Sequence, residues 1–362
     1  MRDETDGLLV QEVGEQGLLQ RLQSFCPADL VGDDAAILTL SSGRSLAVTT
    51  DVLVDGVHFS NQTTSPEDAG WRAVAANFSD LAAMGATPLG ITVGLGLPGT
   101  TPVKWVERLY QGMVECLQQY GTVIAGGDVV RSPVITIAIT ALGEADPTHL
   151  IRRSTAQPGD AIVVTGFHGA SRAGLELLLY PEEGQSLAPG DRAALIRAHR
   201  RPTPRLDILP LLLSLLHPCS PSSPLPYPPL TGMDSSDGLA DALVQICRAS
   251  GVGARLERCQ IPIPPGLVTW VGAEKAMEWA LYGGEDFELV LCLPPETAQT
   301  LMTRLGEGAA ILGTITAGSE VWLMDSSGEF PDLRLTLEQG FQHFADSYSR
   351  GQGTGDGDRR SC

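Results

Sequence analysis

Six short segments of the chain combine acidic residues with glycine or hydroxyl side chains, and these are the residues that could carry chemistry. They are GDD at 32–34, TTD at 49–51, NFSD at 77–80, GGD at 126–128, DSSDG at 234–238 and GGED at 283–286. One such segment alone is typical of a turn or a helix cap. Carboxylates at this density repel one another, however, and are stable together around hard cations such as Mg²⁺. Because glycine lets the backbone approach phosphate oxygens closely, the joint pattern favours metal–polyphosphate chemistry.

The charge of the chain limits the class of ligand. The 362 residues carry a formal net charge of −19, and Lys104 and Lys275 are the only lysines. Such a surface repels phosphate backbones, so nucleic acid is not expected as a partner. A small phosphorylated substrate remains compatible with this charge if metal cations hold it.

Several common catalytic motifs are missing from the sequence. No G-x-x-x-x-G-K-[ST] occurs, so a P-loop is not predicted. Residues 94–99 match G-x-G-x-x-G, but Pro98 lacks the amide that would face a pyrophosphate, and we interpret the segment as a loop. The chain also has no H-E-x-x-H zinc motif and no G-x-S-x-G nucleophile elbow.

Hydrophobic periodicity and turn residues predict a mixed α/β protein. Ser65 as N-cap and Pro66 at the first helical position predict a helix that runs to about Met84, just before Gly85. Segments 35–40 and 45–50 predict a β-hairpin around a Ser-Ser-Gly-Arg turn. Further helices are expected at 8–25, 102–119, 171–180, 241–250 and 274–281, and further strands at 89–97, 122–125, 134–142, 161–165, 289–293 and 310–315.

The TTD and GGD segments each follow an apolar, β-rich run, so their acids are expected at strand ends, where α/β sheets place ligands. Asp80 falls late in the helix after the first of these strands. The length predicts two domains, which we place at 1–145 and 150–346 around an Ala-Asp-Pro-Thr linker. The proline-rich segment 217–232 is expected to be an exposed loop, and 351–362 a disordered tail.

The cysteines favour a reducing compartment. The chain has seven of them, without a C-x-x-C pair or a regular spacing, so neither a disulfide framework nor a zinc ribbon is predicted. The acidic N-terminal segment lacks the apolar region of a signal peptide. The apolar stretches are too short to span a bilayer. We therefore expect a cytoplasmic protein without a membrane partner.

Eight motifs occur in an order that resembles the thiamine-monophosphate kinase family: GDDAAIL, TTDVLVDGVHF, NFSDLAAMGATPLG, GGDVVRS, IRRSTAQPGDAIVVTG, MDSSDGLADAL, GGEDFELV and GFQHF. The resemblance runs from residue 32 to 344. Single motifs are shared with aminoimidazole ribonucleotide synthetase and selenophosphate synthetase. The combination of TTDVLVDGVHF, GGEDFEL and GFQHF is much more specific to the thiamine kinase.

The resemblance implies roles for particular residues. Magnesium-binding positions correspond to Asp34, Thr49, Thr50, Asp51, Asp80, Asp128, Asp234 and Asp237, of which we expect Asp51, Asp128 and Asp237 to be catalytically essential. ATP-contacting positions correspond to Gly127, Asp128, Arg153 and Ser236, and substrate-contacting positions to His58, Glu285 and Phe341. The resemblance also implies a homodimer of two-domain α/β chains, paired through the mixed sheets of their N-terminal domains, with a C-terminal α/β sandwich.

The implied reaction is Mg²⁺-dependent transfer of the γ-phosphoryl group of ATP to thiamine monophosphate, giving thiamine diphosphate and ADP. The acceptor is a phosphate monoester with a second pKa of about 6, so it is a dianion at neutral pH and needs no general base. Catalysis then reduces to in-line positioning and charge neutralisation by several Mg²⁺ ions, with Arg153 as a fixed cation. We expect direct transfer without a phosphoenzyme.

Two alternatives follow from the same residues. The chain could be another ATP-dependent synthetase of the superfamily, although Cys26 lacks the glycine-rich surroundings of a selenophosphate synthetase. It could also be a non-catalytic magnesium–nucleotide-binding module, which the complete set of acidic ligands disfavours. The sequence departs from the family at Val129-Val130, where Thr-Thr is usual, at Arg72, where Lys is common, and in the length of the proline-rich segment.

Overall fold

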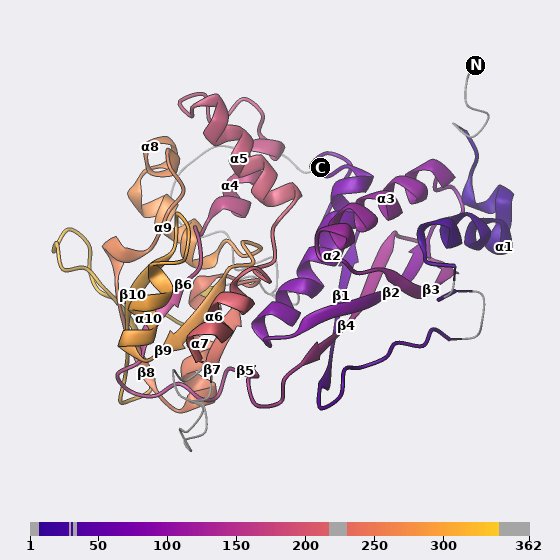
Figure 1. The fold of residues 1–362 in the computed structure, drawn as a ribbon. Helices are drawn as coiled ribbons and strands as arrows, with labels where there is room; N and C mark the ends of the chain where they lie inside the picture. The colour runs from indigo at the N-terminus through magenta and orange to yellow at the C-terminus, as the bar shows by residue number, and fades with distance from the viewer. Residues whose placement is uncertain (1–6, 29, 32–34, 217–229, 340–362) are drawn as a thin grey trace.

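Two β-sheets organise the chain in the computed structural model, which describes residues 7–28, 30–31, 35–216 and 230–339. The first sheet has four strands in the order β1-β4-β2-β3, and the second has eight in the order β12-β11-β8-β10-β6-β9-β7-β5. Figure 1 shows the four-stranded sheet on the right and the eight-stranded sheet on the left, with helices packed on each. This architecture confirms the predicted two-domain α/β fold class.

The N-terminal domain holds the four-stranded sheet. Its β4 is antiparallel to β1 and β2, whereas β2 and β3 run parallel. The helices α2 and α3 lie on one side of the sheet (Figure 1). The elements are α1 (Val10–Leu22), η1 (Gln23–Phe25), β1 (Ser45–Val54), α2 (Pro66–Ala83), β2 (Thr87–Leu97), α3 (Val103–Gln119), β3 (Ile124–Arg131) and β4 (Thr136–Ala145).

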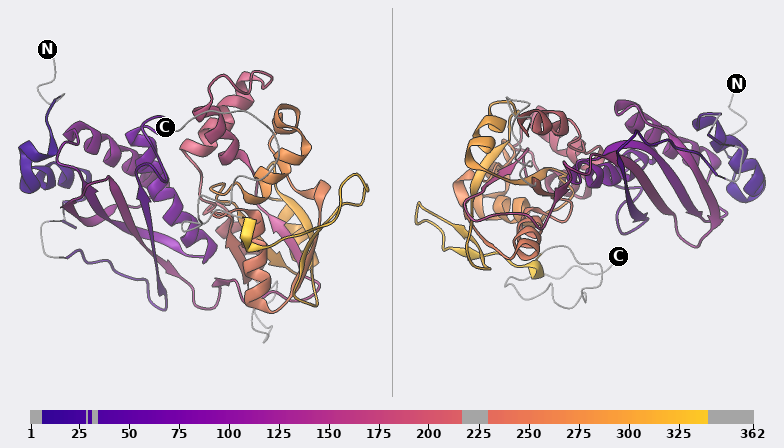
Figure 2. Two further views of the ribbon diagram at one scale, coloured as in Figure 1. Left: turned by 180° about the vertical axis from the view of Figure 1, so that it is seen from behind. Right: turned by 60° about the horizontal axis from the view of Figure 1, so that its bottom comes forward.

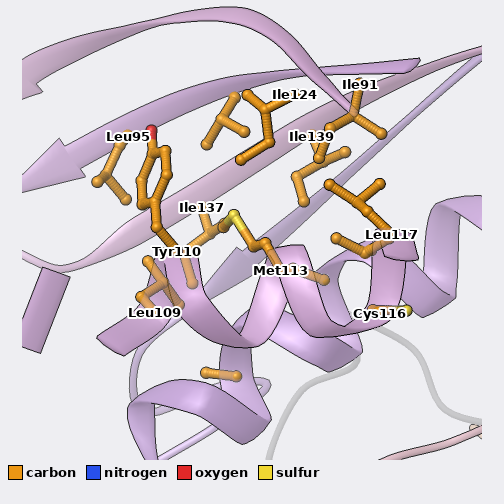
Figure 3. Packing of buried hydrophobic residues seen from close by; sticks show 14 of the residues in the cluster. Ile91, Leu95, Leu109, Tyr110, Met113, Cys116, Leu117, Ile124, Ile137 and Ile139 are labelled. Atoms are coloured by element: carbon orange, nitrogen blue, oxygen red, sulfur yellow. The ribbon is translucent and has the colours of Figure 1, made fainter. Parts of the chain in front are cut away.

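The core of this domain lies between α3 and the sheet, where Met113 and Leu117 pack on Ile91, Ile124 and Ile139 (Figure 3). Two glycines let α2 approach α3. A Cβ on Gly70 would lie 2.0 Å from the Leu109 carbonyl oxygen, and one on Gly112 would lie 1.9 Å from that of Glu67. Because no larger residue fits this crossing, the packing fixes the position of α2, the helix that carries Asp80.

The C-terminal domain holds the eight-stranded sheet and most of the helices. Its first half contains β5 (Ile151–Arg152), β6 (Ala161–Val164), α4 (Ala170–Leu179), α5 (Pro189–Arg200), α6 (Ile208–Leu216), β7 (Leu230–Asp234), α7 (Leu239–Ser250) and β8 (Gly253–Glu257). Its second half contains η2 (Arg258–Gln260), α8 (Leu267–Val271), α9 (Ala273–Tyr282), β9 (Leu289–Leu293), α10 (Pro295–Met302), β10 (Ala310–Thr316), β11 (Val321–Met324), β12 (Leu333–Arg334) and η3 (Leu337–Gln339).

This sheet is covered on both faces. Ile162 and Val164 of β6 belong to a cluster with α7 and α9, whereas Val163 belongs to one with α6 and α10. Ala82, near the end of α2, is fully buried in the second cluster. The helix therefore bridges the domains: it lies on the N-terminal sheet and inserts its last turn into the C-terminal core. Figure 2 shows α2 at the junction from two further directions.

Several predicted elements are confirmed. Ser65 caps α2, with its hydroxyl accepting from the Asp68 amide at 3.2 Å. Pro66 occupies the first helical position, and Gly85 follows the helix with φ of +73°. These predictions succeed because helix capping, and the left-handed glycine that follows the helix, depend on residues adjacent in sequence.

Three predictions are wrong. Residues 35–40 form no strand, and β1 pairs with β4, which is distant in sequence, instead of closing a hairpin. The TTD and GGD segments lie inside β1 and β3, because both strands extend three residues beyond the acid. Residues 230–232 begin β7, so the proline-rich loop ends earlier than predicted; residues 217–229 lie outside the described part.

The domain boundary that we propose falls between β4 and β5, where neither sheet extends. The predicted tail at 351–362 lies outside the described residues. Within the described ranges, none of the helices has the length and apolar character required to cross a membrane.

Candidate active site at the domain interface

Four aspartates from both domains gather where α2 meets the C-terminal sheet. Asp51 comes from β1 and Asp80 from α2, whereas Asp234 ends β7 and Asp237 follows three residues later. The hydroxyl of Ser79 donates to Asp234 Oδ2 at 2.6 Å, a direct hydrogen bond between the domains. Segments separated by more than 150 residues in sequence thus contribute to one cluster, which we call the interface cluster: Asp51, Asp80, Asp234 and Asp237.

The pKa values of these carboxylates are shifted by the charges of their neighbours in the cluster. The pKa of Asp234 is raised to about 7, mainly by burial and also by the charges of Asp80 and Asp51, while hydrogen bonds from the Ser79 and Ser236 hydroxyls oppose the rise. Burial likewise raises the pKa of Asp51 to about 6, with Asp80 and Asp237 adding to the effect. Among the described residues, the negative charge of Asp51 and Asp234 is therefore incompletely compensated.

Asp80 is close to both Asp51 and Asp234. Burial raises its pKa, while a hydrogen bond from Thr49 and the positive charge of Arg153 oppose the rise. Arg153 is exposed and donates to Gln245 Oε1 at 2.8 Å. Arg153 is therefore near enough to affect Asp80, but it does not bind any of the four carboxylates directly.

The cluster suits a hard divalent cation that also binds phosphate oxygens. Within the described residues, no three His, Cys, Asp or Glu side chains surround a common metal position. Mg²⁺ in phosphoryl-transfer sites is typically bound by one or two carboxylates, with waters and substrate phosphates completing the octahedron. These mutually repelling acids, of which Asp234 is buried and Asp237 is exposed, fit that ligand set, because a bound cation would relieve the repulsion between them.

Thr49 and Thr50 diverge, because successive residues of a strand point to opposite faces. Thr49 donates to Asp80 on the α2 side. Thr50 lies on the opposite face, where its hydroxyl bonds that of Thr140 at 2.8 Å. The structure therefore brings Thr49 to the interface cluster and leaves Thr50 on the face that α2 does not cover.

Gly127 and Asp128 lie away from the interface cluster within one chain. The strand register places Asp51, Ile139, Val93 and Gly127 in one row across the sheet, with Asp51 and Gly127 on opposite edge strands. Three strand spacings of about 4.8 Å separate them by ~14 Å. A single Mg²⁺ with ligands at about 2.1 Å cannot bridge that distance. The prediction that Asp128 joins the other aspartates therefore does not hold within one subunit.

A cavity of about 170 Å³ borders the GGD segment. Gly126, Gly127 and Asp128 line one side, and Leu22, Cys26 and Tyr110 are among the apolar and aromatic residues of the other sides. Sequence analysis did not identify Tyr110 or Cys26 as site residues. No motif marks them, because they reach the cavity through the packing of η1 and α3 on β3.

The predicted substrate residues His58 and Glu285 share one neighbour, Arg72. The guanidinium donates to Glu285 Oε1 at 2.5 Å and to the backbone oxygen of His58 at 3.0 Å. His58 Nδ1 accepts from the amide of Val54 at 3.0 Å. Asp34 and Phe341, also predicted at the site, lie outside the described residues.

Two family models match the chain. They are "AIR synthase related protein, N-terminal domain" over residues 32–145 and "AIR synthase related protein, C-terminal domain" over residues 231–325. The matched regions contain β1, α2 and the GGD segment in the first case, and Asp234 and Asp237 in the second. The chain is thus an AIR synthase related protein, and its interface cluster lies within the two matched regions.

Known relatives narrow this class. Thiamine-monophosphate kinase of Synechococcus elongatus is 52% identical over 336 residues, which cover 92% of this chain and 98% of the relative. The crystal structure of thiamine-monophosphate kinase from Stenotrophomonas maltophilia K279a has a TM-score of 0.72 at 31% identity and covers 85% of this chain and 95% of that one. AaThiL complexed with AMPPCP and TMP has a TM-score of 0.67 at 30% identity, covering 91% and 98%. The chain belongs to the thiamine-monophosphate kinase family.

Proposed function

We propose that this chain transfers the γ-phosphoryl group of ATP to the phosphate of thiamine monophosphate, giving thiamine diphosphate and ADP, at the interface cluster. The observation that carries the proposal is the meeting of Asp51, Asp80 and Asp234 from two domains without enough positive charge to balance them. The relative solved with AMPPCP and TMP supports an adenine nucleotide and a phosphorylated acceptor as the two ligands.

Bound Mg²⁺ would neutralise the phosphates so that two anions can approach each other. The residues of the chain position those ions and the reactants. Asp234, held by the Ser79 and Ser236 hydroxyls, presents a carboxylate from the C-terminal sheet. Asp51 and Asp80 present theirs from the N-terminal domain. Ser236, half-buried beside Asp234, and Arg153, exposed near Asp80, would contact phosphate oxygens.

No general base is needed for this reaction, because the acceptor phosphate is already a dianion at neutral pH. The two buried histidines of the C-terminal domain agree with that reading. Burial lowers the pKa of both His168 and His199 to about 4, so both are weak bases that are poorly matched to proton abstraction near neutral pH, and both bond to buried serines. Direct in-line transfer therefore depends on positioning rather than on proton abstraction.

The cavity beside Gly127 is the part of the site that we assign to ATP. Its glycines let a ligand approach the backbone of β3, and the Tyr110 ring provides an apolar wall. Arg153 and Ser236 would contact phosphates at the interface cluster instead. A nucleotide that reaches from the cavity to the interface cluster of the same subunit must span about the width of the sheet, which is ~14 Å.

A homodimer would shorten the distance between the cavity and an interface cluster. The sheet face opposite α2 exposes Leu46, Val48, Val52 and Val130, by 46–56% of their surface. Thr50 and Asp128 lie on the same face. We propose that a second copy covers this apolar face. If the two sheets pair face to face about a two-fold axis, the β3 edge of one copy lies near the β1 edge of the other, and Asp128 of the partner subunit approaches Asp51.

Five described cysteines, at positions 26, 116, 247, 259 and 292, are free thiols. Free thiols suit a reducing compartment, and we propose the cytoplasm as the place of action.

Product analysis tests the reaction. Incubation with thiamine monophosphate, ATP and Mg²⁺ is expected to give thiamine diphosphate and ADP in equal amounts, and removal of divalent cations with a chelator is expected to stop it. Isolation of the protein after reaction with γ-labelled ATP is expected to give unlabelled protein. Label retained on the chain would contradict direct transfer, and ADP release without thiamine diphosphate would contradict the assigned acceptor.

A further inference from the structure

The turn at 283–287, between α9 and β9, has an unusual backbone. Glu285 has φ of +58° and Phe287 has φ of +54°, and they are the two non-glycine residues with positive φ among those described. Such conformations are unfavourable for residues with a Cβ and persist where surrounding contacts hold them. The contacts that hold this turn in place therefore indicate its role.

The turn rests directly on the loop that carries Ser236 and Asp237. The Glu285 amide donates to the carbonyl oxygen of Ser236 at 2.7 Å. A Cβ on Gly284 would lie 2.8 Å from the same oxygen, and one on Gly238 would lie 2.8 Å from the Leu281 carbonyl oxygen. Because glycines allow contact on both sides, the 234–238 loop and the turn are packed backbone to backbone. A displacement of the turn would displace Asp237.

Glu285 connects this assembly to the other domain. Its Oε1 accepts from Arg72 Nη2 at 2.5 Å, and Arg72 is 2% exposed. The other arm of the guanidinium donates to the His58 backbone oxygen at 3.0 Å, so Arg72 also holds the segment after β1. Arg72 precedes Asp80 by eight residues on α2, which is ~12 Å along a rigid helix. One side chain is thus linked to all three elements that supply the interface cluster.

We infer that Arg72 is a positioning residue for the phosphoryl-transfer site. Its guanidinium fixes the 283–287 turn against α2, and the turn holds Ser236 and Asp237 in register with Asp80 and Asp51. Arg72 touches no reacting atom in this scheme. Glu285 has a double role. Its carboxylate binds Arg72, and because the side chain is 38% exposed, its remaining surface can contact the substrate.

The fork geometry of Arg72 matters to this role. Two separate nitrogens bind two partners that belong to different domains. Lysine at this position would keep the charge but reach one partner at a time, and methionine would reach neither. A graded loss from arginine through lysine to methionine therefore distinguishes positioning from simple packing.

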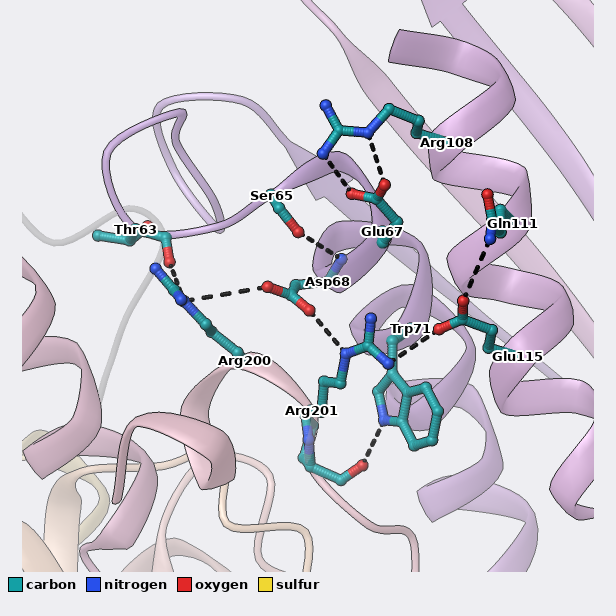
Figure 4. Close-up of polar contacts among 11 residues, drawn as sticks. Thr63, Ser65, Glu67, Asp68, Trp71, Arg108, Gln111, Glu115, Arg200 and Arg201 are labelled. Carbon is teal, nitrogen blue, oxygen red and sulfur yellow. Dashed lines mark hydrogen bonds and ion pairs between the residues drawn. The ribbon is translucent and has the colours of Figure 1, made fainter. Parts of the chain in front are cut away.

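A second set of contacts between the domains supplies a matched control. The segment after α5 places Arg201 against Asp68 at 2.7 Å, against Glu115 at 2.9 Å, and 5.2 Å from the centre of the Trp71 ring (Figure 4). The Trp71 indole also donates to the Pro202 oxygen at 2.8 Å. These contacts join the domains at the first turns of α2 and at α3. They do not include the 283–287 turn.

Amide hydrogen exchange of the full-length protein without substrate or metal tests the inference independently of the proposed reaction. We compare Arg72→Met, Arg72→Lys and Arg201→Met. Arg72→Met is expected to speed exchange in 234–238 and 283–287 by about tenfold or more, and Arg72→Lys by less than about threefold. Arg201→Met is expected to speed exchange around 200–205 and to leave those two segments unchanged.

Kinetics and Mg²⁺ titrations of the same variants complete the test. Arg72→Met is expected to lower kcat by at least about tenfold and to raise the half-saturating Mg²⁺ concentration, with the KM for ATP within about twofold of wild type. Arg201→Met is expected to preserve the half-saturating Mg²⁺ concentration. If Arg72→Met is insoluble, Arg72→Lys and Glu285→Gln are each expected to show the exchange pattern in weaker form. Unchanged exchange in 234–238, or equal changes in the Arg72 and Arg201 variants, would overturn the inference.

Discussion

The two edges of the N-terminal sheet offer contrasting environments for the phosphate groups of the proposed reaction. At the β1 edge, Asp51 joins acids from α2 and the C-terminal domain in a site where burial and repulsion raise the pKa of Asp51 to about 6 and that of Asp234 to about 7. At the β3 edge, Gly126 and Gly127 border an open cavity and Asp128 is exposed. We propose that the first edge binds phosphate through metal cations and that the second does so beside the backbone of Gly126 and Gly127.

In the proposed arrangement, the metal end of the site draws on two domains and the nucleotide end on one. The interface cluster exists only because α2 inserts into the C-terminal core next to β7. The cavity at β3 is complete within the N-terminal domain. Loss of domain alignment should therefore affect metal binding and phosphoryl transfer much more than nucleotide binding.

The largest effect is expected at the β1 edge. Substitution of Asp51 by Asn removes one charge from the interface cluster and should lower kcat by about 10³-fold, equivalent to ~4 kcal/mol of transition-state stabilisation. Steady-state kinetics at saturating Mg²⁺ measure the loss. Circular dichroism serves as the control for folding, and an Asp51→Asn protein that keeps a tenth of the wild-type kcat would remove Asp51 from the account.

The raised pKa of Asp234 in the interface cluster should make the folding stability of the protein depend on pH. Asp234 has a pKa raised from 3.8 to about 7 in the folded state. Its contribution to folding stability is thus fully present below about pH 4 and is lost as pH rises through 7. Without divalent cations, wild-type protein should lose about 2–4 kcal/mol of unfolding free energy over this range relative to Asp234→Asn.

Denaturant unfolding at pH 4.5 and 7.5 in chelator measures that difference. Addition of Mg²⁺ should abolish it by stabilising the ionised cluster. Glu274→Gln is the matched control, because Glu274 is exposed in the first turn of α9, outside the interface cluster, and its substitution should leave the pH dependence as in wild type. Parallel pH profiles for wild type and Asp234→Asn would show that Asp234 is not an uncompensated acid.

A smaller effect is expected at the β3 edge. Asp128→Asn should raise the KM for ATP by about 10–100-fold, equivalent to ~1.4–2.7 kcal/mol, because it weakens the polyphosphate contact without disturbing the buried cluster. Initial rates over a range of ATP concentrations measure the change. An Asp128→Asn enzyme with a normal KM for ATP but a kcat as low as that of Asp51→Asn would show that Asp128 acts in the same step as Asp51 and contradict its role in ATP binding.

The smallest expected effect concerns the pairing of the two edges across a dimer. Val48 is 56% exposed on the apolar sheet face. Val48→Glu should weaken dimerisation by at least about tenfold, or ~1.4 kcal/mol, since it buries a charge in an apolar contact. Sedimentation velocity gives the oligomeric state, with Val268→Glu, at an exposed position of the C-terminal domain, as the control. A wild-type protein that remains monomeric at all concentrations would remove the dimer from the account.

Much of the site can be predicted from the sequence because its acids stand in short motifs with local signals. The start and end of α2 follow from Ser65, Pro66 and Gly85, and Asp80 lies late in that helix, as predicted. Strand pairing is not local, and the hairpin prediction is wrong because β1 pairs with β4 about 90 residues away.

The glycines of the GGD segment mislead the sequence-based prediction for a physical reason. Glycine favours turns, so the strand is predicted to end before Gly126. In the structure a Cβ on Gly127 would lie 2.2 Å from the Val93 carbonyl oxygen, so glycine is required for close pairing inside β3. The separation of Asp128 from Asp51, the cavity wall at Tyr110 and the role of Arg72 depend on sheet order and on domain packing, which no segment of sequence reveals alone.

The central claim is that the interface cluster binds divalent cations. Crystals grown with Mn²⁺ and a non-hydrolysable ATP analogue would test it most directly through anomalous scattering. The account predicts at least one Mn²⁺ peak within about 2.3 Å of carboxylate oxygens of Asp51, Asp80 or Asp234. Well-ordered nucleotide with every Mn²⁺ peak remote from those three residues would contradict it.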